Sequence, residues 1–295
     1  MSSYNRYIRV RLLKNPSFLA LVAFLCATAL VGLPKVSTLK NKFKEKNQRL
    51  SALSNEIESL RLGQRIQAAQ ISRQNASYKS QRKRDNILNP VFQITGDSAV
   101  GSAVLVKHVV TEDESYYIAL SCYHVIRDIL EEQDGTEIES IFEQNREQAL
   151  FLSGTMIAYD AQVDLALLRI DTELDLGRVA SLAPRTRDKV IDTFTEIYTV
   201  GCPLGTPVQA TSGEISREDW TMEDEDYWMV STPAYFGNSG GGVFLAETCE
   251  LIGIFSKIYT HGAYQPQVIT HMGLAVPIDI IHDWLDGIGF DLSKR

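Results

Sequence analysis

The chain changes its hydrophobic pattern near residue 90. Residues 18–33 carry no charge, and from residue 39 to residue 71 apolar side chains recur at alternating steps of four and three. This spacing places them on one face of a helix and is typical of a coiled coil. Seven of the ten positions are apolar: Leu39, Phe43, Leu50, Leu53, Ile57, Leu60 and Ile71. We expect a basic helical stalk over residues 35–90, with a coiled coil and a single solvated helix as alternatives.

The length of the uncharged segment lies between the lengths typical of a membrane span and of a cleavable signal core. A membrane span needs about 17–25 apolar residues, and a cleavable signal core about 7–15. Four basic residues precede the segment: Arg6, Arg9, Arg11 and Lys14. We expect residues 1–34 to form a basic N-terminus and an uncleaved transmembrane signal anchor that contacts membrane lipid; a cleaved signal and a buried helix are the alternatives. Basic residues on both sides do not decide the orientation, and we expect a single-pass protein with the remainder on the extracytoplasmic, periplasmic side.

Short β-rich runs separated by turns follow residue 90. Many short strands at modest spacing are typical of a sandwich or a barrel. The runs cover residues 100–106, 117–120, 164–170, 197–200, 228–232, 251–255 and 274–276. Helical periodicity is limited to residues 125–132 and 278–285. We expect residues 91–295 to form one all-β domain.

Charge separates the same two regions. Up to Pro90 there are 17 Lys or Arg and 4 Asp or Glu, and after it 12 and 33, so a net charge of -8 divides into +13 and −21. This distribution excludes a generally basic nucleic-acid binder, and we expect no nucleic-acid partner. Two acidic runs, 128–147 and 218–226, lack the glycine-containing calcium-loop pattern, so solvated insertions are favoured over a calcium site.

The four cysteines are scattered along the chain, at Cys26, Cys122, Cys202 and Cys249. Their number is too small for a disulfide scaffold, and their spacing does not fit a structural zinc site. We expect no metal and no cofactor.

A serine enclosed by glycines lies at residues 237–242, Gly-Asn-Ser-Gly-Gly-Gly. Glycine permits backbone conformations that a side chain forbids, so successive N–H groups can converge beside the hydroxyl of Ser239. Acyl transfer needs such an arrangement, because its tetrahedral intermediate places negative charge on the former carbonyl oxygen. A plain glycine-rich turn is the alternative.

A histidine and an aspartate occupy comparable strand ends. His124 follows an apolar strand and precedes a short helix, and a serine nucleophile needs such an imidazole as general base. Asp164 begins another apolar strand, where a buried carboxylate needs a hydrogen-bond donor such as an imidazole N–H. Asp160 and Asp128 are competing carboxylates, and Asp128 is disfavoured because it lies one helical turn beyond His124.

The order His124, Asp164, Ser239 resembles that of the trypsin-like serine proteases, and the flanking segments resemble their HtrA/Deg-type branch. The supporting segments are Gly-Ser-Ala-Val at 101–104, Val-Gly-Cys-Pro-Leu-Gly at 200–205, Thr-Ser-Gly-Glu-Ile-Ser at 211–216, Leu-Ile-Gly-Ile at 251–254 and Met-Gly-Leu-Ala-Val-Pro at 272–277. The resemblance implies two six-stranded antiparallel β-barrels with an active site between them. It also implies a catalytic triad of Ser239, His124 and Asp164, with the N–H groups of Gly237 and Ser239 as the oxyanion hole.

The chain departs from this family at several positions. Gly242 and Phe236 stand where the family usually has proline, and only ten residues follow residue 285, too few for a PDZ domain. The resemblance places the substrate pocket along residues 233–236, 255–257 and 273–275, and no acidic residue stands at its expected base. We therefore favour a medium-sized apolar P1 residue over a basic one. The substrate-binding candidates are Pro233, Tyr235, Phe236, Phe255, Ser256 and Lys257.

These features together predict a membrane-tethered serine endopeptidase that cleaves polypeptides through an acyl-enzyme and self-associates through its stalk. The alternative is a non-catalytic, membrane-anchored coiled-coil scaffold whose trypsin-like domain binds polypeptides without cleaving them.

Overall fold

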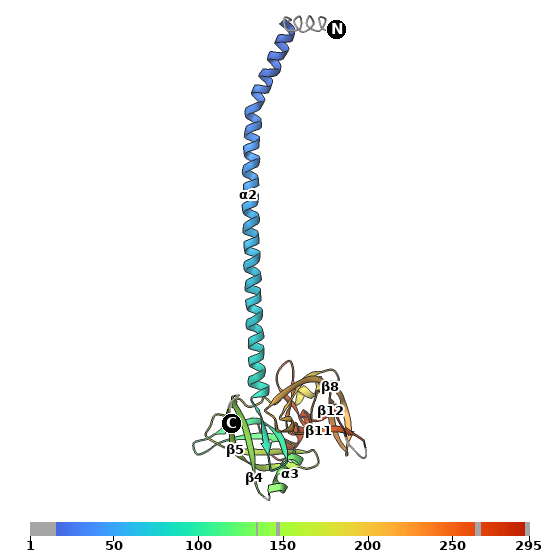
Figure 1. The fold of residues 1–295 in the computed structure, drawn as a ribbon. Helices are drawn as coiled ribbons and strands as arrows, with labels where there is room; N and C mark the ends of the chain where they lie inside the picture. Colours follow the sequence, from blue (N-terminus) through green and yellow to red (C-terminus); the bar gives the residue numbers. More distant parts are fainter. Residues whose placement is uncertain (1–15, 134, 146–147, 263–266, 293–295) are drawn as a thin grey trace. The chain divides into compact units, whose positions relative to one another are not determined.

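The computed structural model describes residues 16–133, 135–145, 148–262 and 267–292, and the chain divides into two compact units, 1–76 and 77–295 (Figure 1). The helix α2 (Pro16–Lys83) makes up the described part of the first unit and continues into the second. All seven apolar residues of the predicted stalk seam are exposed on it. Among the described residues of this single chain, no other segment covers this face of the helix.

The predicted membrane anchor is not supported by the structure. Among the residues that the structure describes, no helix combines the length and the apolar character that a membrane span requires. Residues 1–15 lie outside the described residues, as do the side chains of Phe18 and of residues 29–33 within the predicted anchor.

The second unit contains the two six-stranded antiparallel barrels expected from the sequence. The first has the strand order β1-β2-β3-β6-β5-β4 and the second β10-β11-β12-β9-β8-β7. The first barrel consists of β1 (Val91–Thr95), β2 (Val100–Val110), β3 (Ser115–Ser121), β4 (Glu137–Asn145), β5 (Gln148–Asp160) and β6 (Leu165–Asp171). The second consists of β7 (Glu196–Gly201), β8 (Gln209–Met222), β9 (Glu225–Val230), β10 (Gly242–Leu245), β11 (Leu251–His261) and β12 (Gln267–Pro277).

Short helices connect and complete the barrels. They are the π-helix η1 (Arg84–Leu88), α3 (Tyr123–Gln133), the 3-10 helices η2 (Arg185–Val190) and η3 (Pro203–Gly205), and α4 (Ile278–Gly287). The two stretches predicted as helical from their periodicity correspond to α3 and α4.

The acidic run 128–147 is not simply a solvated insertion, because it contributes a strand to the first barrel. In β4 the side chains of Ile138, Ser140 and Phe142 are buried, whereas Glu137 and Glu139 between them are exposed. Such alternation is typical of a strand with one face in a core. The ring of Phe142 stacks on that of Phe92 in β1, with 4.3 Å between the ring centroids. The acids therefore lie on the outer face of the strand.

Gly242 has a packing role in the second barrel. A Cβ atom at this position would lie 2.3 Å from the ring of Phe244 and 2.9 Å from the side chain of Leu251. Phe244 and Leu251 are both fully buried. Any side chain at residue 242, including the proline usual in the resembled family, would displace this part of the core.

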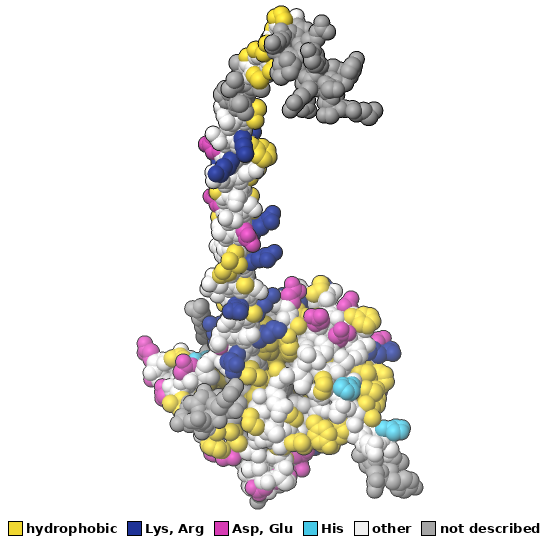
Figure 2. All heavy atoms as spheres, turned by 45° about the horizontal axis from the view of Figure 1, so that its top comes forward, with side chains coloured by type: hydrophobic (Ala, Val, Ile, Leu, Met, Phe, Trp, Pro, Cys, Tyr) yellow, Lys and Arg dark blue, Asp and Glu magenta, His cyan; other side chains and the backbone are white. Residues whose placement is uncertain are grey.

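The basic cluster at residues 81–84 is not simply a solvated linker. Arg82 donates a hydrogen bond from Nη2 to the carbonyl oxygen of Thr248 at 2.8 Å, and Lys83 hydrogen-bonds the hydroxyl of Tyr198. The ammonium of Lys83 also lies over the Tyr198 ring. Ile87 in η1, directly beyond, is buried. The last residues of α2 therefore contact the second barrel just before the chain enters the first. Figure 2 shows Lys and Arg side chains along the helix and Asp and Glu side chains over the barrels.

Candidate active site

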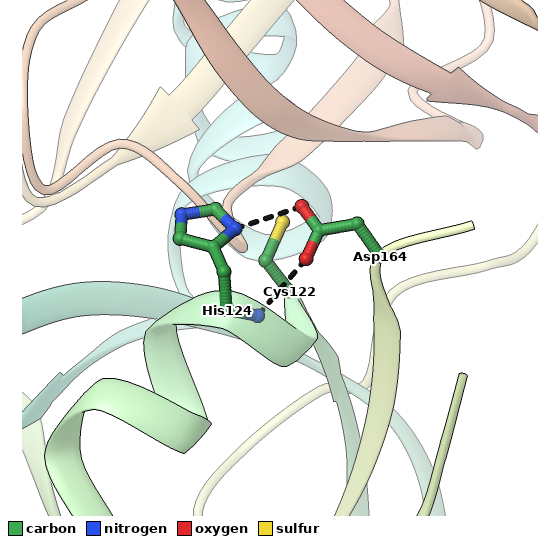
Figure 3. Close-up of side chains that lie close together, drawn as sticks. All are labelled: Cys122, His124 and Asp164. Atoms are coloured by element: carbon green, nitrogen blue, oxygen red, sulfur yellow. Dashed lines mark hydrogen bonds and ion pairs between the residues drawn. The ribbon is translucent and has the colours of Figure 1, made fainter. Parts of the chain in front are cut away.

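Asp164 and His124 are hydrogen-bonded to each other. His124 lies in the first turn of α3, directly after β3, and Asp164 immediately precedes β6. Nδ1 of His124 lies 2.8 Å from Oδ2 of Asp164, and the backbone N–H of His124 donates to Oδ1 at 2.9 Å (Figure 3). An ionised carboxylate only accepts hydrogen bonds, so the imidazole proton is assigned to Nδ1 and Nε2 keeps a free lone pair. Asp164 thus fixes both the orientation and the tautomer of His124.

A serine of the second barrel also binds this carboxylate. Ser256, in β11, donates its hydroxyl to Oδ2 of Asp164 at 2.5 Å. Burial alone would raise the pKa of Asp164, which is 6% exposed, but the hydrogen bonds from His124 and Ser256 outweigh it and lower the pKa. The Asp164 carboxylate is therefore ionised at neutral pH, and it joins the two barrels through its hydrogen bonds.

Ser239 is tied to the same residue of β11. Its hydroxyl donates to the carbonyl oxygen of Ser256 at 2.8 Å. Within the part of the chain that the structure describes, no hydrogen bond joins Ser239 to His124. Both residues line one cavity of about 480 Å³. The structure thus brings the three residues of the predicted triad to one cavity, with the serine hydroxyl turned toward the backbone of β11.

The backbone at Gly237 is held by the turn that follows β7 in the second barrel. Gly237 has φ +94°, and a Cβ there would lie 2.4 Å from the carbonyl oxygen of Cys202. The Leu204 N–H donates to the Phe236 carbonyl oxygen at 2.7 Å. The C=O and N–H of one trans peptide point in opposite directions, so the Gly237 N–H points away from this turn. Among the described residues, the N–H groups of Gly237 and Ser239 donate to no other group, which leaves both available to bind an oxygen.

The cavity lies between the barrels and receives residues from both. The first barrel and its connections supply Tyr123, His124, Arg127, Ala161, Gln162 and Asp164, and the second supplies Glu223, Phe236, Ser239, Ser256, Lys257 and Ile258. Of the six predicted substrate-binding residues, Phe236, Ser256 and Lys257 line it. Pro233 and Tyr235 do not, and Phe255 is fully buried in the core of the second barrel.

Two side-chain pairings at the cavity were not predicted from the sequence. Lys257 pairs with Glu223 at 2.5 Å, and Gln162 donates to Glu225 at 2.5 Å. Burial would lower the pKa of Lys257, but the bond to Glu223 raises it. Glu223 belongs to the acidic run 218–226, which forms the turn end of the β8–β9 hairpin and reaches the cavity. The run is visible in the sequence, but its spacing does not indicate that Glu223 pairs with Lys257.

One cluster in the described part of the chain brings together three side chains of metal-binding type. The ligand atoms of Cys122, His124 and Asp164 lie within 4.8 Å of one another (Figure 3). Burial raises the pKa of the Cys122 thiol well above its usual range, and the thiol donates to the carbonyl oxygen of Phe255 at 3.3 Å. A metal would need the thiolate and would have to break the bond between His124 and Asp164, so we assign no metal to this cluster.

The fold and the cavity agree with the class of protein that the sequence resembles. The sequence model of the trypsin-like peptidase domain matches residues 101–254. The chain therefore belongs to the trypsin-like peptidase family, as the resemblance indicated. No curated protein sequence matches it.

Solved structures similar to this chain include an HtrA-type protease, Deg5 and a serine endoprotease. The HtrA-type protease AlgW, solved with a tripeptide, matches with a TM-score of 0.53 and 21% identity over 70% of this chain and 62% of that one. Deg5 matches with a TM-score of 0.55 and 17% identity over 73% of this chain and 98% of that one. A serine endoprotease from Yersinia pestis matches with a TM-score of 0.50 and 21% identity over 71% of this chain and 66% of that one. The chain thus spans less than two thirds of AlgW, and at these identities the likeness concerns the fold.

The depressed pKa of Asp164 makes its stabilising effect dependent on pH. We expect Asp164→Asn to lower the free energy of unfolding at pH 7 by about 1–3 kcal/mol, because an amide cannot replace the charged acceptor. The charged form stabilises the fold above the unfolded pKa, near about 3.9, and this stabilisation is lost as the pH falls through the lower folded pKa. Urea unfolding at pH 7 and at acid pH measures the difference. Asp160→Asn is the control. If Asp164→Asn lowers the free energy of unfolding as much at acid pH as at pH 7, the expectation is wrong.

Proposed function

We propose that the chain cleaves polypeptides with Ser239 as nucleophile, His124 as general base and Asp164 as the carboxylate that orients the imidazole. The observation that carries the proposal is the pair of hydrogen bonds from His124 to one carboxylate, 2.8 Å from Nδ1 and 2.9 Å from the backbone, beside a cavity that Ser239 also lines. This arrangement leaves Nε2 of His124 as the basic atom of the ring, and among the described residues it is paired with no carboxylate.

The reaction begins with a change in the Ser239 side chain. Its hydroxyl turns from the Ser256 carbonyl toward Nε2 of His124, a rotation about one side-chain bond. Oγ then bonds the carbonyl carbon of the scissile peptide while its proton moves to Nε2. The imidazolium returns that proton to the leaving amine as the C–N bond breaks. A water molecule releases the acyl group by the same route, which regenerates the Ser239 hydroxyl.

The N–H groups of Gly237 and Ser239 bind the oxyanion of this reaction. Their lack of other acceptors in the described part of the chain supports the assignment. Such donors act in a site prepared before the charge develops, and removal of one typically costs on the order of 10²- to 10³-fold in rate.

An exposed strand edge beside Ser239 suits an extended polypeptide substrate. β10 pairs with β11 only as far as Ile254, whereas Lys257 and Ile258 pair with β12 on the other side. A peptide that adds to the free edge forms main-chain hydrogen bonds, and its side chains enter neighbouring pockets. Phe236 and Ile258 line the cavity here, which supports the preference for a medium-sized apolar P1 residue.

The nucleophile can be tested directly. Ser239→Ala should abolish peptide cleavage and labelling by a fluorophosphonate probe while leaving the unfolding transition unchanged, because only the attacking oxygen is removed. Cleavage of casein and gel detection of the probe provide the measurements. Folded wild-type protein that neither cleaves nor reacts would instead support the non-catalytic scaffold.

We also propose that the α2 seam joins copies of this chain. Its seven apolar residues are exposed in the single helix, and burying them against a second copy would stabilise the assembly. Leu53→Glu combined with Leu60→Glu should convert a dimer or trimer of the full chain in detergent into a monomer by sedimentation. Leu62 and Ile66 are similarly exposed but lie off the seam, so the same change there should leave the assembly intact. A wild-type monomer would exclude the coiled coil.

Membrane attachment through residues 18–33 is a further proposal, and it is supported by the uncharged sequence alone. We expect the full chain to remain in the membrane fraction after an alkaline carbonate wash, and the pair Val22→Asp and Leu25→Asp to release it, because a charge within a span is costly. Protease protection in spheroplasts would then locate the peptidase domain. Recovery of the wild-type chain in the wash would contradict the anchor.

A further inference from the structure

Ser102 lies at the centre of the interface between the barrels. It belongs to β2 of the first barrel and is fully buried. Its hydroxyl donates to the Gly237 carbonyl oxygen at 2.7 Å, and its backbone N–H donates to the Ser239 carbonyl oxygen at 2.9 Å. Its own carbonyl oxygen accepts the hydroxyl of Ser121 at 2.7 Å. One residue of the first barrel thus binds two carbonyls of the loop that carries the nucleophile.

These bonds complete a set that fixes the loop peptide by peptide. Each of the four carbonyls from Phe236 to Ser239 accepts a hydrogen bond: from Leu204 N–H, Ser102 Oγ, Gly241 N–H and Ser102 N–H in turn. Because the N–H of a trans peptide points opposite to its C=O, the bonds to the Phe236 and Asn238 carbonyls set where the N–H groups of Gly237 and Ser239 point. The two bonds from Ser102 fix the peptides that alternate with these two, so the whole run is held in one conformation. Ser102 supplies two of the four donors.

The hydroxyl of Ser102 also connects the two segments that hold Gly237. Its oxygen accepts a hydrogen bond from the Cys202 N–H at 2.8 Å, and its proton is donated to the Gly237 carbonyl. The donor and one acceptor position of this hydroxyl are therefore both used. Cys202 begins the turn whose Leu204 N–H holds the Phe236 carbonyl. The surroundings are tightly packed, since a Cβ on Gly240 would lie 2.0 Å from the Ser102 carbonyl oxygen and one on Gly201 3.0 Å from the Ser102 hydroxyl.

We propose that Ser102 is a positioning residue whose hydroxyl fixes the Gly237–Asn238 peptide and thereby keeps the oxyanion-binding N–H groups of Gly237 and Ser239, on either side of that peptide, in their working orientation. The proposal rests on the proposed function, because it assigns a role within that same site. An alanine at this position leaves the Gly237 carbonyl and the Cys202 N–H without their partner. The peptides on either side of Gly237 then gain alternative orientations, and the oxyanion site is no longer fixed before the reaction.

The test compares Ser102→Ala with Ser140→Ala in the full chain. Ser140 is also fully buried in the first barrel, and its hydroxyl has no partner among the described residues, so it is a matched control. With a peptide substrate, Ser102→Ala should lower kcat by on the order of 10²- to 10³-fold and leave KM within about threefold. A peptide trifluoromethyl ketone, which forms an oxyanion adduct with the nucleophile, should lose affinity in parallel. Ser140→Ala should match the wild type, and Ser102→Thr, which keeps the hydroxyl, should recover much of the lost kcat.

Each alternative result has a distinct meaning. A folded Ser102→Ala enzyme with wild-type kcat would overturn the proposal while leaving the peptidase assignment intact. Failure of both Ser102 variants to fold would assign the residue to the fold alone and would also overturn it. A wild-type enzyme without activity or probe labelling would remove the proposed function, and with it the role of Ser102.

Discussion

The ionised carboxylate of Asp164, buried between the two barrels, is the interaction on which the rest of the site depends. Removing a charge from water is costly, and the cost is offset only when donors converge on both oxygens. Here the donors come from α3 and β11, in different barrels. Asp164 itself adopts the left-handed φ of 57°, which is unfavourable for a residue other than glycine. Separation of the barrels would leave this charge incompletely paired, so the geometry of the site and the docking of the barrels stabilise each other.

Ser256 transmits this constraint to Ser239, the proposed nucleophile. Its hydroxyl binds Asp164 while its carbonyl oxygen accepts the hydroxyl of Ser239. The carbonyls around Ser239 are held by Ser102 of the first barrel and by the turn at Leu204 of the second. The three residues of the proposed triad are therefore positioned by the same interface. In the proposed reaction the Ser239 hydroxyl leaves the Ser256 carbonyl by rotation about a single bond.

Sequence patterns predicted the parts of this structure that are local in the chain. The apolar runs of β2, β3, β6 and β11 are buried strands, and the strand-end positions of His124 and Asp164 follow from them. β8 is not among the predicted strand runs, because most of its side chains are exposed. The hydroxyl bonds of Ser102 and Ser256 join residues 135 and 92 positions apart. No spacing rule reaches that far. Phe255 was a pocket candidate because the resemblance assigns a whole segment, 255–257, and does not distinguish the core face of that strand from the face toward the cleft; the structure buries Phe255 in the core.

The acidity of residues 91–295 has a different role from the charges in the cavity. Arg127 pairs with Asp128 at 2.6 Å and Lys257 with Glu223 at 2.5 Å, so the charges that line the cavity are largely compensated where a substrate would bind. The uncompensated acids lie on outer faces, as in β4 and the β8–β9 hairpin. Charges so placed act through solvent over a Debye length of about 8–10 Å. Such charges act on the approach of a charged polypeptide to a cleft, whereas the proposed cleavage step depends on the short hydrogen bonds between the barrels, which salt screens far less.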